Sequence, residues 1–329
     1  MHILIIGAAG MVGRKLTQAL LAAGTIAGRD ISALTLVDVV AADVPVSDTP
    51  ISALAADLSL PGTAQTLAAT RPDLIFHLAA IVSGEAEADF DKGYRINLDG
   101  TRLLLEAIRQ EGMKAPYCPR LVFTSSIAVF GAPLPPAIPD DMAHTPLTSY
   151  GTQKAICELL LADYSRRGFV DGIGIRLPTV VVRPGKPNKA ASGFFSGIIR
   201  EPLNGMEAVL PVDDSVRHWF ASPRSAIGFL LHAAGLDTAP LGQRRNLSMP
   251  GLSATIAEEI AALERFGGTK ALRLIRREPD ETIARIVAGW PQNFDTGRAI
   301  ALGFRAETSF DDIVRAHIED ELGGQIGNG

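Results

Sequence analysis

Short apolar runs alternate with amphipathic stretches of helical length through the first half of the chain. Nearly continuous apolar runs are typical of strands that are buried on both faces of a parallel sheet. We expect strands over 3–6, 34–38, 74–78, 121–124 and 173–182, the last interrupted at Pro178, and helices over 11–23, 94–111 and 150–166. The alternation predicts an α/β fold, a Rossmann-like doubly wound parallel sheet.

The second half has a different pattern. Gly, Pro, Asn and Lys are frequent from 183 to 217, and further short elements are expected at 194–200, 222–234, 245–249 and 255–266. The last of these begins with a capping-box pattern, Thr255 and Glu258. We therefore expect a Rossmann domain over 1–180 and 218–250, and a smaller mixed α/β cap over 181–217 and 251–329.

Composition narrows the classes of function. The chain has 329 residues, is 47% apolar and has a formal net charge of -5, so we expect a globular protein with no nucleic-acid or membrane-surface partner. Cys118 and Cys157 show no metal spacing, and we expect reduced thiols and no metal site. The opening MHILIIG suits a strand better than a signal peptide, and no run approaches the roughly 18–20 apolar residues of a membrane span. We expect a cytoplasmic location.

A glycine-rich turn follows the first expected strand. Gly7, Gly10 and Gly13 stand where a helix begins, and such a turn lets a pyrophosphate approach the N–H groups of a helix N-terminus. Asp38 ends the second strand, where an acid binds the adenosine ribose and repels a 2′-phosphate, so NAD is favoured over NADP. Asp57 follows a further expected strand and is a candidate for the adenine side. A purely structural turn and a solvated acid at the strand end are the alternatives.

Tyr150 and Lys154 form Y-x-x-x-K on an expected helix, so both lie on one face. A free tyrosine has a pKa near 10, and lowering it by about three units requires roughly 4 kcal/mol of differential stabilisation. A lysine ammonium and a positive nicotinamide ring would both favour the phenolate, which could then remove a proton from a substrate hydroxyl. The preceding strand ends in three hydroxyl residues, Thr124, Ser125 and Ser126. One of these hydroxyls could hold the substrate oxygen next to the tyrosine.

Together these pieces resemble the extended short-chain dehydrogenase/reductase superfamily, also called the NAD-dependent epimerase/dehydratase family. The matching segments cover almost the whole chain: GAAGMVG at 7–13, HLAA at 77–80, NLDGT at 97–101, TSSIAVFG at 124–131, YGTQK at 150–154 and RHW at 217–219.

The resemblance implies Tyr150 as the general base, Lys154 as its partner on the nicotinamide ribose, and Ser126 rather than Ser125 as the catalytic serine. It also implies a homodimer through helices 95–111 and 150–166. The residues expected to contact NAD are Gly7, Gly10, Met11, Val12, Gly13, Asp38, Asp57, Leu78, Ala79, Ala80, Asn97, Tyr150, Lys154 and Leu177.

Three positions depart from the pattern of the nucleotide-sugar enzymes in this superfamily. Thr179 stands in place of an asparagine, Phe130 in place of a tyrosine, and His218 in place of an acid after Arg217. The basic loop 180–194 contains Arg183, Lys186 and Lys189. Together with IVSGEAEADF at 81–90 and SGIIREPLNG at 196–205, it resembles instead the D-erythronate dehydrogenases, a group that oxidises the C2 hydroxyl of a four-carbon sugar acid with NAD.

A small anionic sugar acid is therefore the expected substrate, because a carboxylate is bound well by arginine or lysine. The expected substrate-binding residues are Ser83, Ser126, Thr179, Arg183, Lys186 and Arg217, with Arg217 favoured for the carboxylate. The alternatives are a nucleotide-sugar 4-epimerase with tightly held NAD, a solvated basic surface loop, and a dinucleotide sensor without catalysis.

Overall fold

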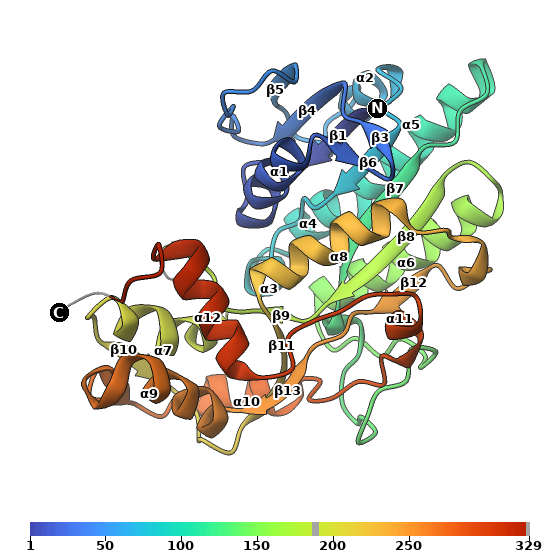
Figure 1. Ribbon diagram of the computed structural model, residues 1–329. Helices are drawn as coiled ribbons and strands as arrows, with labels where there is room; N and C mark the ends of the chain where they lie inside the picture. The colour runs from blue at the N-terminus through green and yellow to red at the C-terminus, as the bar shows by residue number, and fades with distance from the viewer. Residues whose placement is uncertain (186–190, 327–329) are drawn as a thin grey trace. The chain divides into compact units, whose positions relative to one another are not determined.

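Seven parallel strands form the main sheet of the computed structural model, which describes residues 1–185 and 191–326 (Figure 1). Their order is β12-β8-β7-β6-β1-β4-β5. The strands are β1 (His2–Ile6), β4 (Ala33–Asp38), β5 (Ile51–Ala55), β6 (Leu74–His77), β7 (Arg120–Ser126), β8 (Asp171–Leu177) and β12 (Asn246–Ser248). The order reverses between β1 and β6, and ligands of doubly wound sheets bind at such a switch point. The expected Rossmann-like fold is confirmed.

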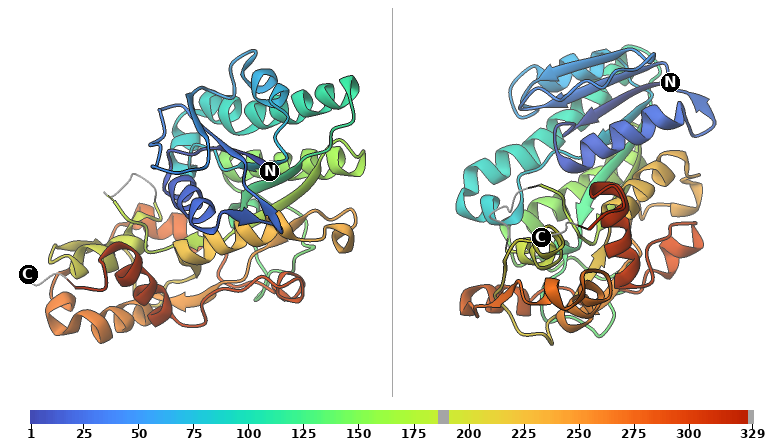
Figure 2. Two further views of the ribbon diagram at one scale, coloured as in Figure 1. Left: turned by 45° about the horizontal axis from the view of Figure 1, so that its top comes forward. Right: turned by 60° about the vertical axis from the view of Figure 1, so that its left-hand side comes forward.

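Helices cover both faces of this sheet. Leu104 and Leu161 of the helices on one face pack with Leu121 and Phe123 of β7 in one apolar core, and Figure 2 shows α1 and α8 on the opposite face. The helices and short turns are α1 (Met11–Ala23), α2 (Thr63–Ala69), α3 (Ser83–Ala88), α4 (Phe90–Gly93), the π-helical turn η1 (Tyr94–Asp99), α5 (Gly100–Lys114), the 3-10 turn η2 (Ile127–Val129), α6 (Ser149–Arg166), α8 (Pro223–Gly235) and the 3-10 turn η3 (Ala239–Leu241). A two-stranded hairpin, β2 (Thr25–Ile26) and β3 (Arg29–Asp30), follows α1.

The chain divides into two compact units. Unit 1 comprises 1–129, 146–176 and 227–248, and unit 2 comprises 130–145, 177–226 and 249–329. Segments 130–145 and 218–226 thus group with unit 2, whereas we expected both in the Rossmann domain. Which unit binds cofactor and which binds substrate stays a prediction.

Unit 2 has its own apolar core, built around Phe195, Phe220, Ile256, Leu263 and Phe310. Its elements are β9 (Thr179–Val180), α7 (Gly193–Leu203), β10 (Ala208–Leu210), β11 (Arg217–Ala221), β13 (Leu252–Thr255), α9 (Ile256–Leu272), β14 (Ile275–Arg277), α10 (Glu281–Ala288), α11 (Gly297–Ala301) and α12 (Phe310–Glu321). β9, β11 and β13 form a three-stranded sheet, and β10 pairs with β14. The capping box of Thr255 and Glu258 at the start of α9 is present as expected.

The interruption expected at Pro178 is present, and one expected helix differs from the structure. The run 173–182 is two strands, because Pro178 has no N–H to donate: β8 ends at Leu177, and Thr179–Val180 pairs with β11 instead. The helix expected over 94–111 begins as the π-helical turn η1 and continues as α5. Within the described residues, no helix is long and apolar enough to cross a membrane.

Candidate active site

The glycine turn lies where β1 runs into α1, and its backbone is packed tightly. Gly7 has φ +95°, and a Cβ there would lie 2.6 Å from the backbone nitrogen of Ala79. A Cβ on Gly13 would lie 2.2 Å from the carbonyl oxygen of Gly7. A side chain is therefore excluded by contact at both positions, and at Gly7 also by its positive φ.

The entrance to α1 is open by contrast. A Cβ on the exposed Gly10 would meet only the Gly7 carbonyl, at 3.5 Å, and no side chain of the described residues caps this helix N-terminus. The N–H groups of Met11 and Val12 begin the helix beside it. A helix N-terminus reached over glycine backbone fits a pyrophosphate, so the residues present fit a dinucleotide.

Asp38 ends β4 beside this turn. Its carboxylate accepts hydrogen bonds from the N–H groups of Ala9 (2.9 Å) and Val39 (2.7 Å), so it also orders the glycine turn. Asp57 lies after β5 and pairs with Arg95 at 3.0 Å. Burial opposes ionisation of Asp57, but hydrogen bonds from Ser59 and Arg95 outweigh it and lower its pKa. The carboxylate oxygens of Asp57 therefore already accept hydrogen bonds from within the protein.

Tyr150 and Lys154 lie near the first turn of α6, next to the end of β7. Lys154 is buried; its Nζ lies 5.8 Å from the centre of the Tyr150 ring and donates to the carbonyl oxygen of Thr124 at 2.7 Å. Ser126 Oγ accepts a hydrogen bond from the N–H of Ala128 at 3.1 Å, and the Ser126 side chain favours ionisation of Tyr150 by lowering its pKa. Tyr150, Lys154 and Ser126 are thus brought together in unit 1, as the motif spacing led us to expect.

Burial sets the charges of this group. It raises the pKa of Tyr150 to about 12, although the hydrogen bond with Ser126 lowers it in part. Burial also lowers the pKa of Lys154 to about 8, against the raising effects of Cys157 and Glu158. The protein alone therefore holds Tyr150 as the neutral phenol at pH 7. The lysine that we expected to favour the phenolate does not suffice without a further positive charge.

Asn97 connects the active-site helix to the loop after β6. Its Oδ1 accepts from the N–H of Ile81 (2.9 Å), and its Nδ2 donates to the carbonyl of Ile81 (3.1 Å) and to Gln153 Oε1 (2.7 Å). Asn97 therefore stabilises the loop that contains Ala79 and Ala80. Gln153 was missed in the sequence, and its place between Tyr150 and Lys154 on α6 was the available signal.

Leu78 and Ser83 begin and end this same loop. The N–H of Leu78 donates to Ile6 of β1 at 2.8 Å, and Ser83 starts α3. Leu177 is the last residue of β8 and belongs to unit 2. Their contacts with cofactor or substrate stay predictions.

Two of the departures noted in the sequence contact each other in unit 2. Thr179 Oγ1 and His218 Nε2 are 2.6 Å apart, and the His218 ring stacks on Phe195 with centroids 5.1 Å apart. Burial lowers the pKa of His218 to about 3, so the ring is neutral at physiological pH. His218 therefore carries no negative charge where the nucleotide-sugar enzymes have an acid, and this is compatible with an anionic substrate.

The expected carboxylate ligands in unit 2 differ in their partners. Arg217 donates to the carbonyl of Ser253 at 3.0 Å and lies 3.5 Å from the carboxylate of Glu258. Arg183 donates to Ser192, and burial together with Arg200 lowers its pKa. Lys186, and with it Lys189, lies outside the described residues.

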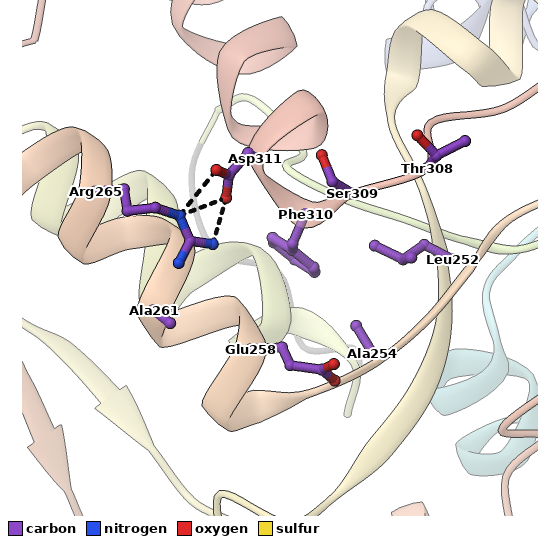
Figure 3. A pocket seen from close by; sticks show the side chains of 9 residues that line it. All are labelled: Leu252, Ala254, Glu258, Ala261, Arg265, Thr308, Ser309, Phe310 and Asp311. Carbon is purple, nitrogen blue, oxygen red and sulfur yellow. Dashed lines mark hydrogen bonds and ion pairs between the residues drawn. The ribbon is translucent and has the colours of Figure 1, made fainter.

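One cavity of about 340 Å³ lies within unit 2, at the start of α12 and beside α9 (Figure 3). Arg265 in its wall pairs with Asp311, the Nε lying 2.9 and 2.8 Å from the two carboxylate oxygens. Its cation is therefore already neutralised. None of the predicted site residues lines this cavity, whose walls are formed by Leu252, Ala254, Glu258, Ala261, Arg265, Thr308, Ser309, Phe310 and Asp311.

The fold and the Tyr150/Lys154 group define a class, and comparison with known proteins agrees with it. The NAD dependent epimerase/dehydratase family matches residues 3–222. The chain belongs to this family and is an NAD-dependent oxidoreductase.

Three relatives show a more particular likeness. The chain is 48% identical to a D-erythronate dehydrogenase of Cupriavidus necator over 97% of this chain and 98% of that protein. It is 43% identical to a D-erythronate dehydrogenase of Haemophilus influenzae over 98% of this chain and 100% of that protein. It is also similar to a crystal structure described as the nucleoside-diphosphate-sugar epimerase from Agrobacterium tumefaciens, with TM-score 0.97 and 66% identity over 99% of this chain and 95% of that one.

Proposed function

We propose that this enzyme oxidises the C2 hydroxyl of a small sugar acid, D-erythronate to 2-dehydro-D-erythronate, with Tyr150 as general base. The observation that carries the proposal is the likeness over the full length to two proteins named D-erythronate dehydrogenase. When bound, NAD supplies a positively charged ring and accepts the hydride.

The residues of the chain support this chemistry at both ends of the substrate. The Ser126 side chain lowers the pKa of Tyr150, so a substrate hydroxyl bound beside Ser126 would be held at the base. Lys154 would hold the nicotinamide ribose. Arg183 and Arg217 are the candidates for the substrate carboxylate, and Thr179, oriented by His218, for a further hydroxyl.

The second candidate function is a nucleotide-sugar epimerase, favoured by the name of the Agrobacterium tumefaciens protein. Two residues argue against an epimerase. Thr179 stands where the nucleotide-sugar enzymes have an asparagine, and His218 stands where they have an acid. The two side chains are hydrogen-bonded to each other.

One assay decides between the two functions. The purified enzyme with NAD is offered four- to six-carbon sugar acids and, in parallel, UDP- and GDP-sugars, and NADH absorbance is followed while sugar products are separated. We expect NADH from D-erythronate and none from its neutral amide. Epimerisation of a UDP-sugar without net NADH would replace the dehydrogenase proposal.

A further inference from the structure

A buried ion pair lies directly behind the Tyr150/Lys154 group. Glu158 of α6 is fully buried, and Arg176 of β8 is 5% exposed. Arg176 holds the carboxylate with two nitrogens: its Nε lies 3.0 and 3.1 Å from the two oxygens, and its Nη2 lies 2.8 Å from Oε2. Ser125 Oγ donates to Glu158 Oε1 at 2.5 Å. This group joins one helix to two strands of the sheet within unit 1.

The ion pair is in register with the proposed catalytic residues. Tyr150, Lys154 and Glu158 are spaced by four residues on α6 and so lie along one face. Lys154 donates to the carbonyl of Thr124, and Glu158 accepts from the hydroxyl of Ser125. Two consecutive residues of β7 are therefore bound to two consecutive turns of α6, immediately before Ser126.

Stability alone does not explain such a pair. The desolvation cost of a buried ion pair often exceeds the gain from its attraction, and apolar residues of similar volume stabilise as well or better. Ser125 and Ser248 add further polar contacts to the same pair, with Ser248 Oγ 3.3 Å from Arg176. A buried polar group at this place needs a role beyond packing.

We infer that Glu158 is a positioning residue. It fixes the end of β7, and with it Ser126, relative to Tyr150 on α6, and its negative charge keeps Lys154 protonated. The inference rests on the proposed function, because it gives Lys154 its part in that reaction.

The groups that face Lys154 support the second half of this inference. From α6 they are Tyr150, Cys157 and Glu158, and from β6 it is His77, whose pKa burial and the Lys154 charge lower to about 3. β7 contributes the Thr124 carbonyl and the Phe123 ring, 4.7 Å from Nζ. His77 and the phenol are neutral at pH 7, and burial raises the pKa of the Cys157 thiol to about 11, so the thiol is neutral as well. Among these groups, the carboxylate of Glu158 is therefore the negative charge that favours the ammonium.

The test is the titration of Lys154 in the whole chain without NAD. The side-chain carbon next to the amine, Cε, is labelled with 13C in all lysines, and the Lys154 signal is assigned by its loss in K154R. We expect Glu158→Gln to move the Lys154 midpoint down by about one pH unit, because an opposite charge is removed. With NAD and substrate, the alkaline limb of kcat should move in the same direction.

Three further variants make the result interpretable. Glu158→Asp restores the charge and should return the midpoint toward that of the wild type. If E158Q does not fold because Arg176 is left buried and unpaired, the neutral double variant E158Q/R176Q takes its place. It also removes a positive charge, but Arg176 lies on β8 beyond the carboxylate, whereas Glu158 is one helical turn from Lys154, so a smaller downward shift is expected. Glu111→Gln is the matched control, since Glu111 is a buried carboxylate of α5 that pairs with Lys114 at 2.5 Å. It should leave the Lys154 midpoint unchanged.

An unchanged midpoint in folded E158Q or in the double variant overturns the inference, even where thermal stability falls. The proposed function fails by a different result. If the wild-type protein produces no NADH from any sugar acid while the midpoint still moves in E158Q, the electrostatic role of Glu158 stands and the dehydrogenase proposal is lost.

Discussion

The ammonium of Lys154 donates a hydrogen bond to the carbonyl oxygen of Thr124, with Nζ and O 2.7 Å apart. The N-terminal part of α6 is thereby anchored to the backbone of β7. The contact places a cation near Tyr150 and binds it to the protein backbone, which cannot rotate away as a side chain can. The position of the lysine is therefore part of the protein's own structure before any cofactor binds.

Replacing Tyr150 by Phe should leave NAD affinity near that of the wild type and lower turnover by about 100- to 10,000-fold, the usual contribution of a positioned acid or base. Calorimetric NAD titration and steady-state NADH formation measure the two quantities. Tyr150→Phe keeps the ring and its packing, so a folding defect is not expected. Turnover close to wild type would remove Tyr150 from the mechanism.

Cofactor choice depends on Asp38. The wild type should bind NAD far better than NADP, because the carboxylate repels a 2′-phosphate. Asp38→Ala should weaken NAD by about 10- to 100-fold through the loss of charge-assisted hydrogen bonds. Asp38→Asn is the matched control: its amide oxygen can still accept from the Ala9 N–H, so it separates the charge from the order of the glycine turn. A preference for NADP in the wild type would contradict this role.

The substrate carboxylate should be bound by Arg217, by Arg183 or by both. Arg217→Ala should lower kcat/KM by about 30- to 10,000-fold, since losing a charge-assisted contact in a closed site costs about 2–5 kcal/mol. Most of the loss should appear in KM, with NAD affinity unchanged. Steady-state kinetics with D-erythronate measure both parameters.

Two variants refine this prediction. Glu258→Gln removes the carboxylate that lies 3.5 Å from Arg217 and keeps a residue suited to the capping box, so KM for the acid should fall. Arg183→Ala tests the loop. A loss in R183A with normal kinetics in R217A would move the carboxylate to Arg183, and normal kinetics in both would refute carboxylate recognition by these arginines.

The stability of unit 2 should depend on pH through Glu259. This side chain of α9 is fully buried, both of its oxygens lack a hydrogen-bond partner within the described residues, and burial raises its pKa well above the usual 4.5. The native state thus holds a proton that the unfolded state releases above pH 4.5, so the native state loses stability as pH rises from there toward the raised pKa.

Replacing Glu259 by Gln or Leu removes that linkage. Relative to the wild type, both variants should gain stability as pH rises above 4.5 toward the raised pKa of Glu259, while below pH 4.5 the difference should be constant. Urea unfolding at several pH values measures it. Parallel stability curves for wild type and variants across this range would show that Glu259 does not titrate on unfolding.

Much of the fold and the order of the site motifs could be predicted from the sequence. Apolar periodicity is a local property, so β1, β4, β6 and the helix Met11–Ala23 were expected close to where they lie. The glycine turn and the Tyr150/Lys154 spacing depend on neighbours in the chain, and their local geometry follows from φ and from the helical repeat. Even the break at Pro178 was visible, because a proline lacks an N–H wherever it stands.

Tertiary structure decided partners and charges. Glu158 meets Arg176, Thr179 meets His218, and Arg217 approaches Glu258 only because the chain folds back over tens of residues. No local pattern encodes these pairs. Desolvation, too, depends on everything packed around a group. The sequence led us to expect a phenolate from the lysine ammonium together with a positive nicotinamide ring, whereas burial in the protein by itself raises the pKa of the phenol to about 12. The sequence alone determined which residues could do chemistry; burial and long-range contacts determined in what charge state they are held.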